Sequence, residues 1–169
     1  MTLNRLTKLK IILVICIGFG FHNQAWSQTM PIQIEADKLD IQDTKGITHY
    51  SGNVIVSQGE TKILGEEVKI SHPNRTLLNL TATGAPAKFQ HFDAEQQLQI
   101  HGQANTIIYF AQEREIHLIG NAYLTQQDSH TIQGPSLIYD MNELTLQAGS
   151  NEAYTGRVIM TFEPQKQAD

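Results

Sequence analysis

A frame of six residues that recurs four times is the feature that most constrains how this chain can fold. It runs from a small residue through two mostly polar positions to an aliphatic residue, a spacer, and then Ile or Tyr. The copies occupy residues 36–41, 65–70, 104–109 and 134–139, so they begin 29, 39 and 30 residues apart. Spacing in this range indicates one supersecondary unit stacked on copies of itself, because a single unit cannot bury its apolar face alone.

Each copy also contains a break in its alternation of apolar and polar residues. Ile32, Ile34 and Ala36 alternate with polar residues, which predicts a strand with one apolar face, and Leu39 and Ile41 then come one position late. All four copies allow the same slip, which predicts a bulge or bend after the small residue. A second frame, opened by glycine, follows each copy, and we interpret the Asn that follows two of these glycines as a turn residue. The second frames begin at Gly52, Gly84, Gly120 and Gly156, and the two asparagines are Asn53 and Asn121.

The apolar pattern predicts an all-β fold. Apolar residues nowhere hold helical spacing over three turns, and the prolines at positions 31, 73, 86, 135 and 164 fall at expected strand ends or kinks. We expect roughly four short strands in each of the four repeats, or about sixteen antiparallel strands. This density is typical of sandwiches, jelly rolls and solenoids.

The first 27 residues are expected to be a cleavable secretory signal peptide. Arg5, Lys8 and Lys10 precede an apolar run at 11–21, and small residues at 25 and 27 suit cleavage after Ser27. The alternative is a membrane anchor, but eleven residues rise only about 16 Å as a helix, against roughly 30 Å of hydrocarbon. We therefore expect one domain at 28–163 and a frayed tail at 164–169.

Processing would leave an acidic chain without cysteine. Cys16, the single cysteine, would leave with the signal, so neither disulfides nor thiol chemistry are expected. Nine cations and 17 anions would remain in 28–169, a net charge of −8. This charge argues against nucleic acid as a partner and against adhesion to an anionic membrane surface.

The residues offer no catalytic chemistry, so the chain is not expected to be an enzyme. It lacks a GxSxG motif and a P-loop, and the six histidines after the signal show no metal-ligand spacing. Glu66 and Glu67, an adjacent carboxylate pair, would point to opposite faces of a strand. We predict neither a metal site nor a cofactor.

The repeats do supply an apolar interior of mixed side-chain sizes. One interpretation is a closed hydrophobic core, and another is an interior left partly open for acyl chains, with about 0.8 kcal/mol gained per buried CH₂. The candidate lining residues are Ile32, Ile34, Ile41, Val54, Val56, Phe89, Ile107, Tyr109, Leu124, Tyr139 and Met160. The terminal strands, expected at 32–35 and 157–162, are candidates for adding a neighbouring chain by backbone pairing. Their candidate stacking residues are Ile32, Gln33, Ile34, Val158, Ile159, Met160 and Phe162.

Four segments resemble the OstA-like repeats of lipopolysaccharide transport proteins. They are residues 32–37, 50–59, 84–89 and 118–124, which occur in family order, and the resemblance covers nearly all of 30–163. It implies an open, twisted β-jelly roll that carries lipopolysaccharide through the periplasm, with the acyl chains of lipid A inside. In the family, groove-lining positions fall at Ile32, Ile34, Phe89 and Tyr109.

The resemblance also implies partners. Such domains stack end to end on copies of themselves, and on OstA-like partners in the inner and outer membranes, to form a bridge. A rival interpretation is a secreted β-solenoid that acts on or adheres to polysaccharide, although units of unequal length argue against it. A third is a structural spacer with a fully packed interior.

Overall fold

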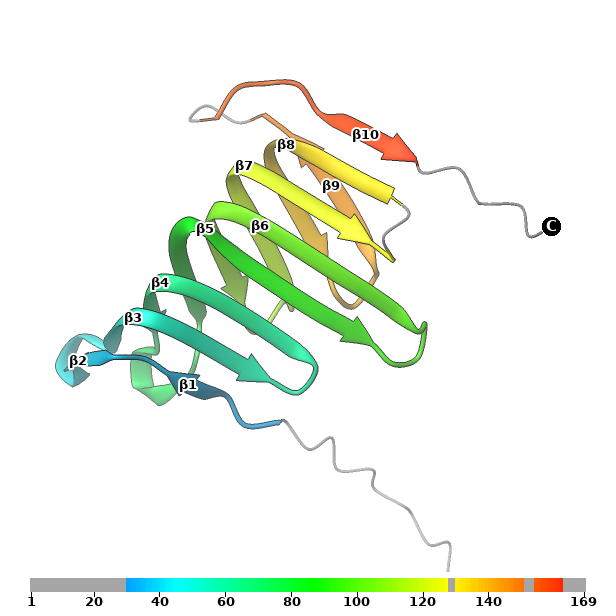
Figure 1. The fold of residues 1–169 in the computed structure, drawn as a ribbon. Coiled ribbons are helices and arrows are strands. Elements are labelled where there is room, and N and C mark those ends of the chain that lie inside the picture. Colours follow the sequence, from blue (N-terminus) through cyan, green and yellow to red (C-terminus); the bar gives the residue numbers. More distant parts are fainter. Residues whose placement is uncertain (1–29, 128–129, 151–153, 163–169) are drawn as a thin grey trace, which may run out of the picture.

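The computed structural model describes residues 30–127, 130–150 and 154–162, and within them the chain is almost entirely strand (Figure 1). The expected signal peptide at 1–27 and the tail at 164–169 lie outside the described residues. The strands are β1 Gln33–Glu35, β2 Lys38–Gln42, β3 Ile47–Gln58, β4 Thr61–Ser71, β5 Asn79–Asp93, β6 Leu98–Phe110, β7 Glu115–Gln126, β8 His130–Asp140, β9 Thr145–Gly149 and β10 Ile159–Phe162. Single 3₁₀ turns at Asp43–Lys45 and Pro73–Arg75 join β2 to β3 and β4 to β5. The part of the chain that the structure describes contains no helix long and apolar enough to cross a bilayer.

All ten described strands belong to one antiparallel sheet that does not close. Its order is β1-β3-β4-β5-β6-β7-β8-β10, and β2 and β9 pair with β3 and β8. Successive long strands are joined as hairpins, so each packs beside its neighbour in the chain. The all-β, antiparallel prediction is confirmed. Stacked-coil solenoids pair parallel strands, so every described pairing argues against the rival solenoid.

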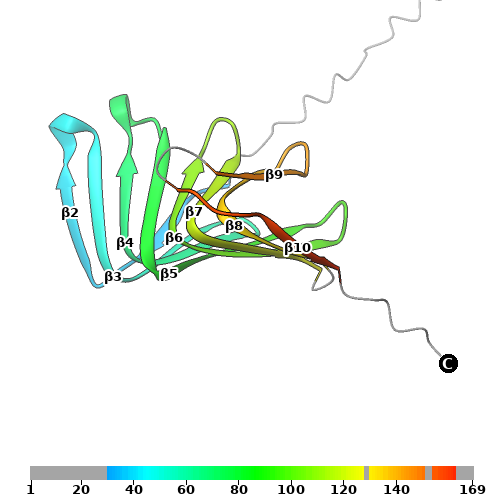
Figure 2. The same ribbon diagram turned by 90° about the horizontal axis from the view of Figure 1, so that it is seen from above.

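The sheet is folded along a line of bulges that crosses its six long strands. The pairing register shifts once between each neighbouring pair from β3 to β8, as between Ser51 and Val54 of β3. β1 and β2 pair with the two halves of β3 on either side of this line, and β10 and β9 do so with β8. The sheet therefore has two facing arms (Figures 1 and 2). Each long strand contributes one half to each arm. Arm one has β1 and β10 as its edge strands, and arm two has β2 and β9.

The bulge expected after each small residue is confirmed in β4 and β6. The register shifts directly after Leu64 and Gln103, where Gly65 and Ala104 stand. The expected count of about sixteen short strands is not confirmed, because six strands cross the bend without ending and the described residues form ten. The terminal strands are also shorter than predicted, since Ile32 precedes β1 and Val158 precedes β10.

Glycine–asparagine pairs form two of the bulges. Gly52 and Asn53 have φ of +80° and +46°, values that favour glycine and are tolerated by asparagine. The Gly52 carbonyl accepts a hydrogen bond from the backbone N–H of Asp37 at 3.0 Å, and the Asn53 amide donates to the Asp37 carboxylate at 2.9 Å. Asn121, with φ of +50°, likewise faces a side chain of the neighbouring strand. Both asparagines therefore lie at bulges inside strands β3 and β7, and not in the turns that the sequence suggested.

We expect Gly52→Ala to lower the free energy of unfolding by about 1–3 kcal/mol, because φ of +80° strains any other residue and the new Cβ would lie 2.9 Å from Asp37 Cβ. Urea denaturation would measure the loss. Gly149→Ala is the matched control, since its Cβ would have nothing within 4 Å. The control should change stability by no more than about 0.5 kcal/mol. Equal effects of the two substitutions would contradict this account of the bend.

Candidate functional site

The inner faces of the two arms carry continuous apolar rows, because alternate residues of each strand point between the arms. Strand register links one such row across all eight strands of arm one. It consists of Ile34, Val56, Ile63, Phe89, Gly102, Leu124, Ile132 and Met160. A corresponding row crosses arm two through Leu39, Tyr50, Val68, Ala82, Ile107, Leu118, Leu137 and Ala148. These rows form the candidate site, which we call the interior.

The arms contact each other through their side chains. A Cβ on Gly102 of arm one would lie 3.2 Å from a methyl group of Leu118 in arm two, so the missing side chain leaves room for that leucine. Near the free margins of the arms, the Tyr109 hydroxyl donates a hydrogen bond of 3.3 Å to Gln58 Oε1. The Gln58 amide in turn donates to the Met30 carbonyl oxygen at 3.1 Å. Gln58 therefore links arm one, arm two and the segment that precedes β1.

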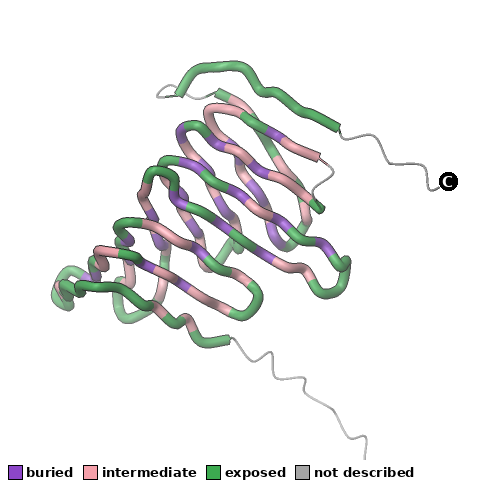
Figure 3. Tube along the Cα trace, in the orientation of Figure 1, coloured by how far each residue is buried: buried purple, intermediate pink, exposed green. Residues whose placement is uncertain are grey.

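Burial is complete in the middle of the interior and is lost at its ends. Phe89, in β5, is 0% exposed, whereas Met160 of the same row is 50% exposed in β10. At the other end, Leu39 and Ile41 of β2 are 55% and 59% exposed. Figure 3 shows the same trend, with buried positions concentrated in the central strands. The cause is that no further strand of the described chain continues the inner rows.

The structure divides the predicted lining residues into three groups. Ile32 and Ile34 are partly buried against the core, and Ile41 and Met160 are exposed. The others lie in the closed middle of the interior: Val54, Val56, Phe89, Ile107, Tyr109, Leu124 and Tyr139. A charged residue substituted at Phe89 would therefore destabilise the fold, because an unpaired buried charge is costly. Such a variant could not report on lipid binding alone.

Sequence reasoning missed several members of the interior. Leu80, Ile116, Leu118 and Ile132 are as buried as the residues it named. Each of them pairs with a predicted lining residue in a neighbouring strand; Leu80, for example, lies opposite Tyr109. Extending the period-two pattern through every strand, with one slip at each bulge, would have found them.

The predicted stacking residues lie at the two ends of the sheet. Within the described residues, β1 pairs with β3 alone and β10 pairs with β8 alone. Val158, Ile159, Met160 and Phe162 are all at least 42% exposed. The ring of Phe162 packs edge-on against His130, with centroids 4.9 Å apart, so the end of β10 is held to β8 by a side-chain contact as well as by its pairing.

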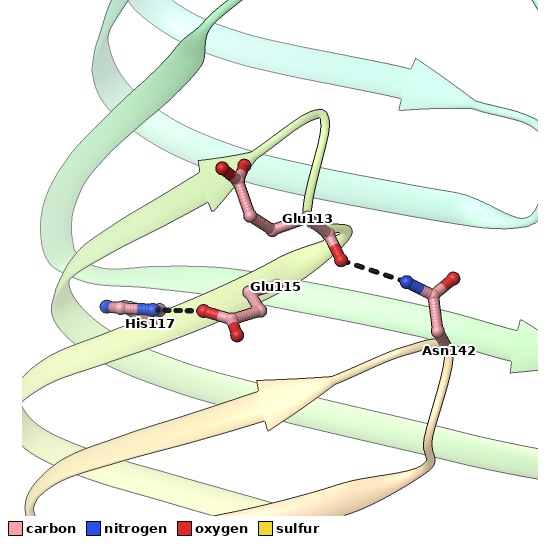
Figure 4. Close-up of polar contacts among 4 residues, drawn as sticks. All are labelled: Glu113, Glu115, His117 and Asn142. Atoms are coloured by element: carbon pink, nitrogen blue, oxygen red, sulfur yellow. Dashed lines mark hydrogen bonds and ion pairs between the residues drawn. The ribbon is translucent and has the colours of Figure 1, made fainter.

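Polar groups gather at the margins and on the outer face rather than in the interior. Figure 4 shows Asn142 Nδ2 donating to the Glu113 carbonyl oxygen at 2.9 Å, which joins two turns of arm two. It also shows His117 Nε2 beside Glu115 Oε2 at 3.0 Å, two side chains on one face of β7. Nowhere in 30–127, 130–150 or 154–162 do three His, Cys, Asp or Glu side chains gather closely enough to hold a metal ion.

Comparison with known proteins identifies the family. The family model described as LptA/(LptD N-terminal domain) LPS transport protein matches residues 33–145. The chain belongs to this family. The match spans the strands from β1 to the start of β9, so the LptA/LptD N-terminal family assignment covers nearly the whole interior. The family consists of transport proteins, not enzymes.

Relatives in the family share most of their length with this chain. The lipopolysaccharide export system protein LptH of Pseudomonas aeruginosa is 29% identical over 144 residues, which cover 82% of each chain. The lipopolysaccharide export system protein LptA of Escherichia coli K12 is 30% identical over 141 residues, which cover 82% of this chain and 74% of that one. The crystal structure of LptH, described as the periplasmic component of the lipopolysaccharide transport device, matches with a TM-score of 0.74 at 28% identity. That match covers 80% of this chain and 96% of LptH.

His91, at the margin of arm one, is a buried histidine. Burial lowers the pKa of His91 below its ordinary value of 6.5, and Arg114 acts in the same direction, whereas Asp93 and Glu60 oppose it. Thr61 Oγ1 lies 2.9 Å from its Nδ1. The folded state therefore favours the neutral ring.

We expect the free energy of unfolding to fall as the pH falls through 6.5 towards the lower pKa of folded His91, because the unfolded chain then binds more protons. The substitution His91→Gln should flatten this part of the profile, as measured by urea denaturation between pH 5 and pH 8. Parallel profiles for the parent and the variant would contradict the assignment.

Proposed function

We propose that this chain is a periplasmic lipopolysaccharide carrier whose two arms shield the acyl chains of lipid A. The observation that carries the proposal is the apolar interior, which runs the length of the sheet and is exposed at both ends. Membership of a lipopolysaccharide transport family supports it. Burying an acyl chain of about 12 carbons contributes roughly 10 kcal/mol before ordering costs, which suffices to keep it out of water.

Loading requires the arms to separate, because the middle of the interior is filled by its own side chains. Backbone hydrogen bonds of the described residues run within each arm or at the bend, so separation breaks side-chain contacts and leaves the ladders intact. The bulges provide the hinge line, since they already interrupt the register. Lipid chains would then replace the contacts that one arm makes with the other.

Charge supports recognition through the chains rather than the headgroup. Residues 28–169 carry a net charge of −8, which opposes binding of an anionic phosphosugar. A carrier that grips acyl chains and repels the headgroup can both hold and release its cargo.

The ends of the sheet suit stacking. A copy adding its β1 and β2 beside β10 and β9 of another would continue both arms by backbone pairing and cover the exposed inner-face side chains. The same edges would receive family members in the inner and outer membranes. In this arrangement the interiors join into one path between the membranes.

A photo-reactive residue at position 41 tests the lipid proposal without disturbing the core. Ile41 is exposed and its side chain faces the interior, whereas the neighbouring Asp40 is exposed on the opposite face of β2. We expect the probe at Ile41 to capture lipopolysaccharide in cells and the probe at Asp40 to capture little. Equal capture at both positions, or capture at neither, would overturn the proposal.

Stacking has its own test in β10. Met160→Asp places a charge at the join between two interiors and should shift the protein towards monomers in light scattering, while its exposure of 50% lets the domain fold. Thr161→Asp puts the same charge on the other face of the strand and should leave the assembly largely intact. Unchanged assembly of Met160→Asp would contradict joining of the interiors.

A further inference from the structure

Tyr139 lies on the inner face of arm two, one residue before the end of β8 and next to the edge strand β9. It lies in β8, in a row with Leu80, Tyr109 and Ile116, and opposite Leu146 of β9. The residue is 1% exposed and belongs to the hydrophobic core. Its hydroxyl oxygen is therefore shielded from water.

The Tyr139 hydroxyl has no hydrogen-bond partner among the described residues, although it is fully buried. Two other polar side chains of the same inner face are paired: the Tyr109 hydroxyl donates to Gln58, and the hydroxyl of Thr48 lies 2.7 Å from His72 Nε2. A buried hydroxyl without a partner costs free energy, whereas phenylalanine would fill the same apolar space without that cost. The protein thus carries an unmatched polar group in the region assigned to the ligand.

The chemistry of this hydroxyl defines what it could bind. Burial, followed by the negative charges of Asp93 and Asp140, raises the pKa of Tyr139 to about 12, so the group stays protonated and can donate a hydrogen bond at neutral pH. Asp93 belongs to arm one, so the hydroxyl also lies in a negative field from the facing arm. A neutral acceptor oxygen suits this position, and an anionic one does not.

We propose that Tyr139 donates a hydrogen bond to a carbonyl oxygen of an acyl chain held between the arms, and so distinguishes ester- or amide-linked chains from plain alkyl chains. This inference rests on the proposed function, since it assumes that acyl chains enter the interior. The rest of the interior would bind a chain by burying apolar surface, and this interaction does not distinguish one kind of chain linkage from another. The Tyr139 hydroxyl would add a specific polar contact.

The test compares the parent protein with Tyr139→Phe on three probes: lipopolysaccharide, monododecanoylglycerol, and the ether analogue 1-O-dodecylglycerol, which lacks the carbonyl. We expect Tyr139→Phe to weaken binding of lipopolysaccharide and of the ester about fivefold, as expected for one lost neutral hydrogen bond. Binding of the ether should not change. Tyr123→Phe, which removes a hydroxyl from the outer face of β7, is the control and should leave all three affinities unchanged.

Thermal unfolding without ligand shows whether the Tyr139 hydroxyl has a hydrogen-bond partner in the free protein. Tyr139→Phe should keep or raise Tm, because no internal hydrogen bond is lost; a lowered Tm would show that the hydroxyl has a partner in the free protein and would overturn the inference. Equal binding of the ester by the parent and the variant would overturn it as well, while leaving the carrier function standing. Failure of the parent to bind any of the three probes would instead overturn the proposed function, and this inference with it.

Discussion

An apolar sheet face has to be covered, and in the described part of this chain the sheet covers itself. Among the described residues, ten antiparallel strands present one apolar face, and neither a helix nor a second sheet packs on it. The sheet folds along a line where the pairing register of all six long strands shifts, so that the two halves of the same face meet. Glycine and asparagine at these shifts accept backbone angles that other residues avoid. Without the bend, residues such as Phe89 and Leu118 would stand in water.

This way of covering a face works only where a strand has neighbours on both sides. In the middle of the sheet each inner side chain is surrounded by its own arm and by the facing one. At β2 and β10 one flank is missing, and the same kinds of side chain become half exposed. The proposed carrier function builds on this contrast, since a core that the described strands leave uncovered at its ends can be continued by another chain or by a lipid.

Local patterns in the sequence revealed the strands, their apolar face and the bulges, because each of these depends on residues close together in the chain. Ile41 and Phe89 could not be distinguished in this way. Both are inward-facing apolar residues, but β2 is an edge strand and β5 is central, and that difference depends on the pairing of the whole sheet. The packing of Leu118 against Gly102 could not be predicted from the sequence for the same reason, since the two residues belong to different arms. The described residues form fewer strands than the sequence suggested, because a bulge resembles a strand end in the sequence.

The two ends of the sheet are different surfaces. Exposed inner-face residues lie on arm two at one end, as Leu39 and Ile41, and on arm one at the other, as Met160 and Phe162. A joint between unlike ends is heterologous and has no two-fold axis to close it. A row of such molecules therefore has a direction and no built-in length, so its extent would be set by protein concentration and by whatever terminates each end. A row of fixed length would require that the molecules bound at its two ends, and not the repeating unit, set the number of copies between them.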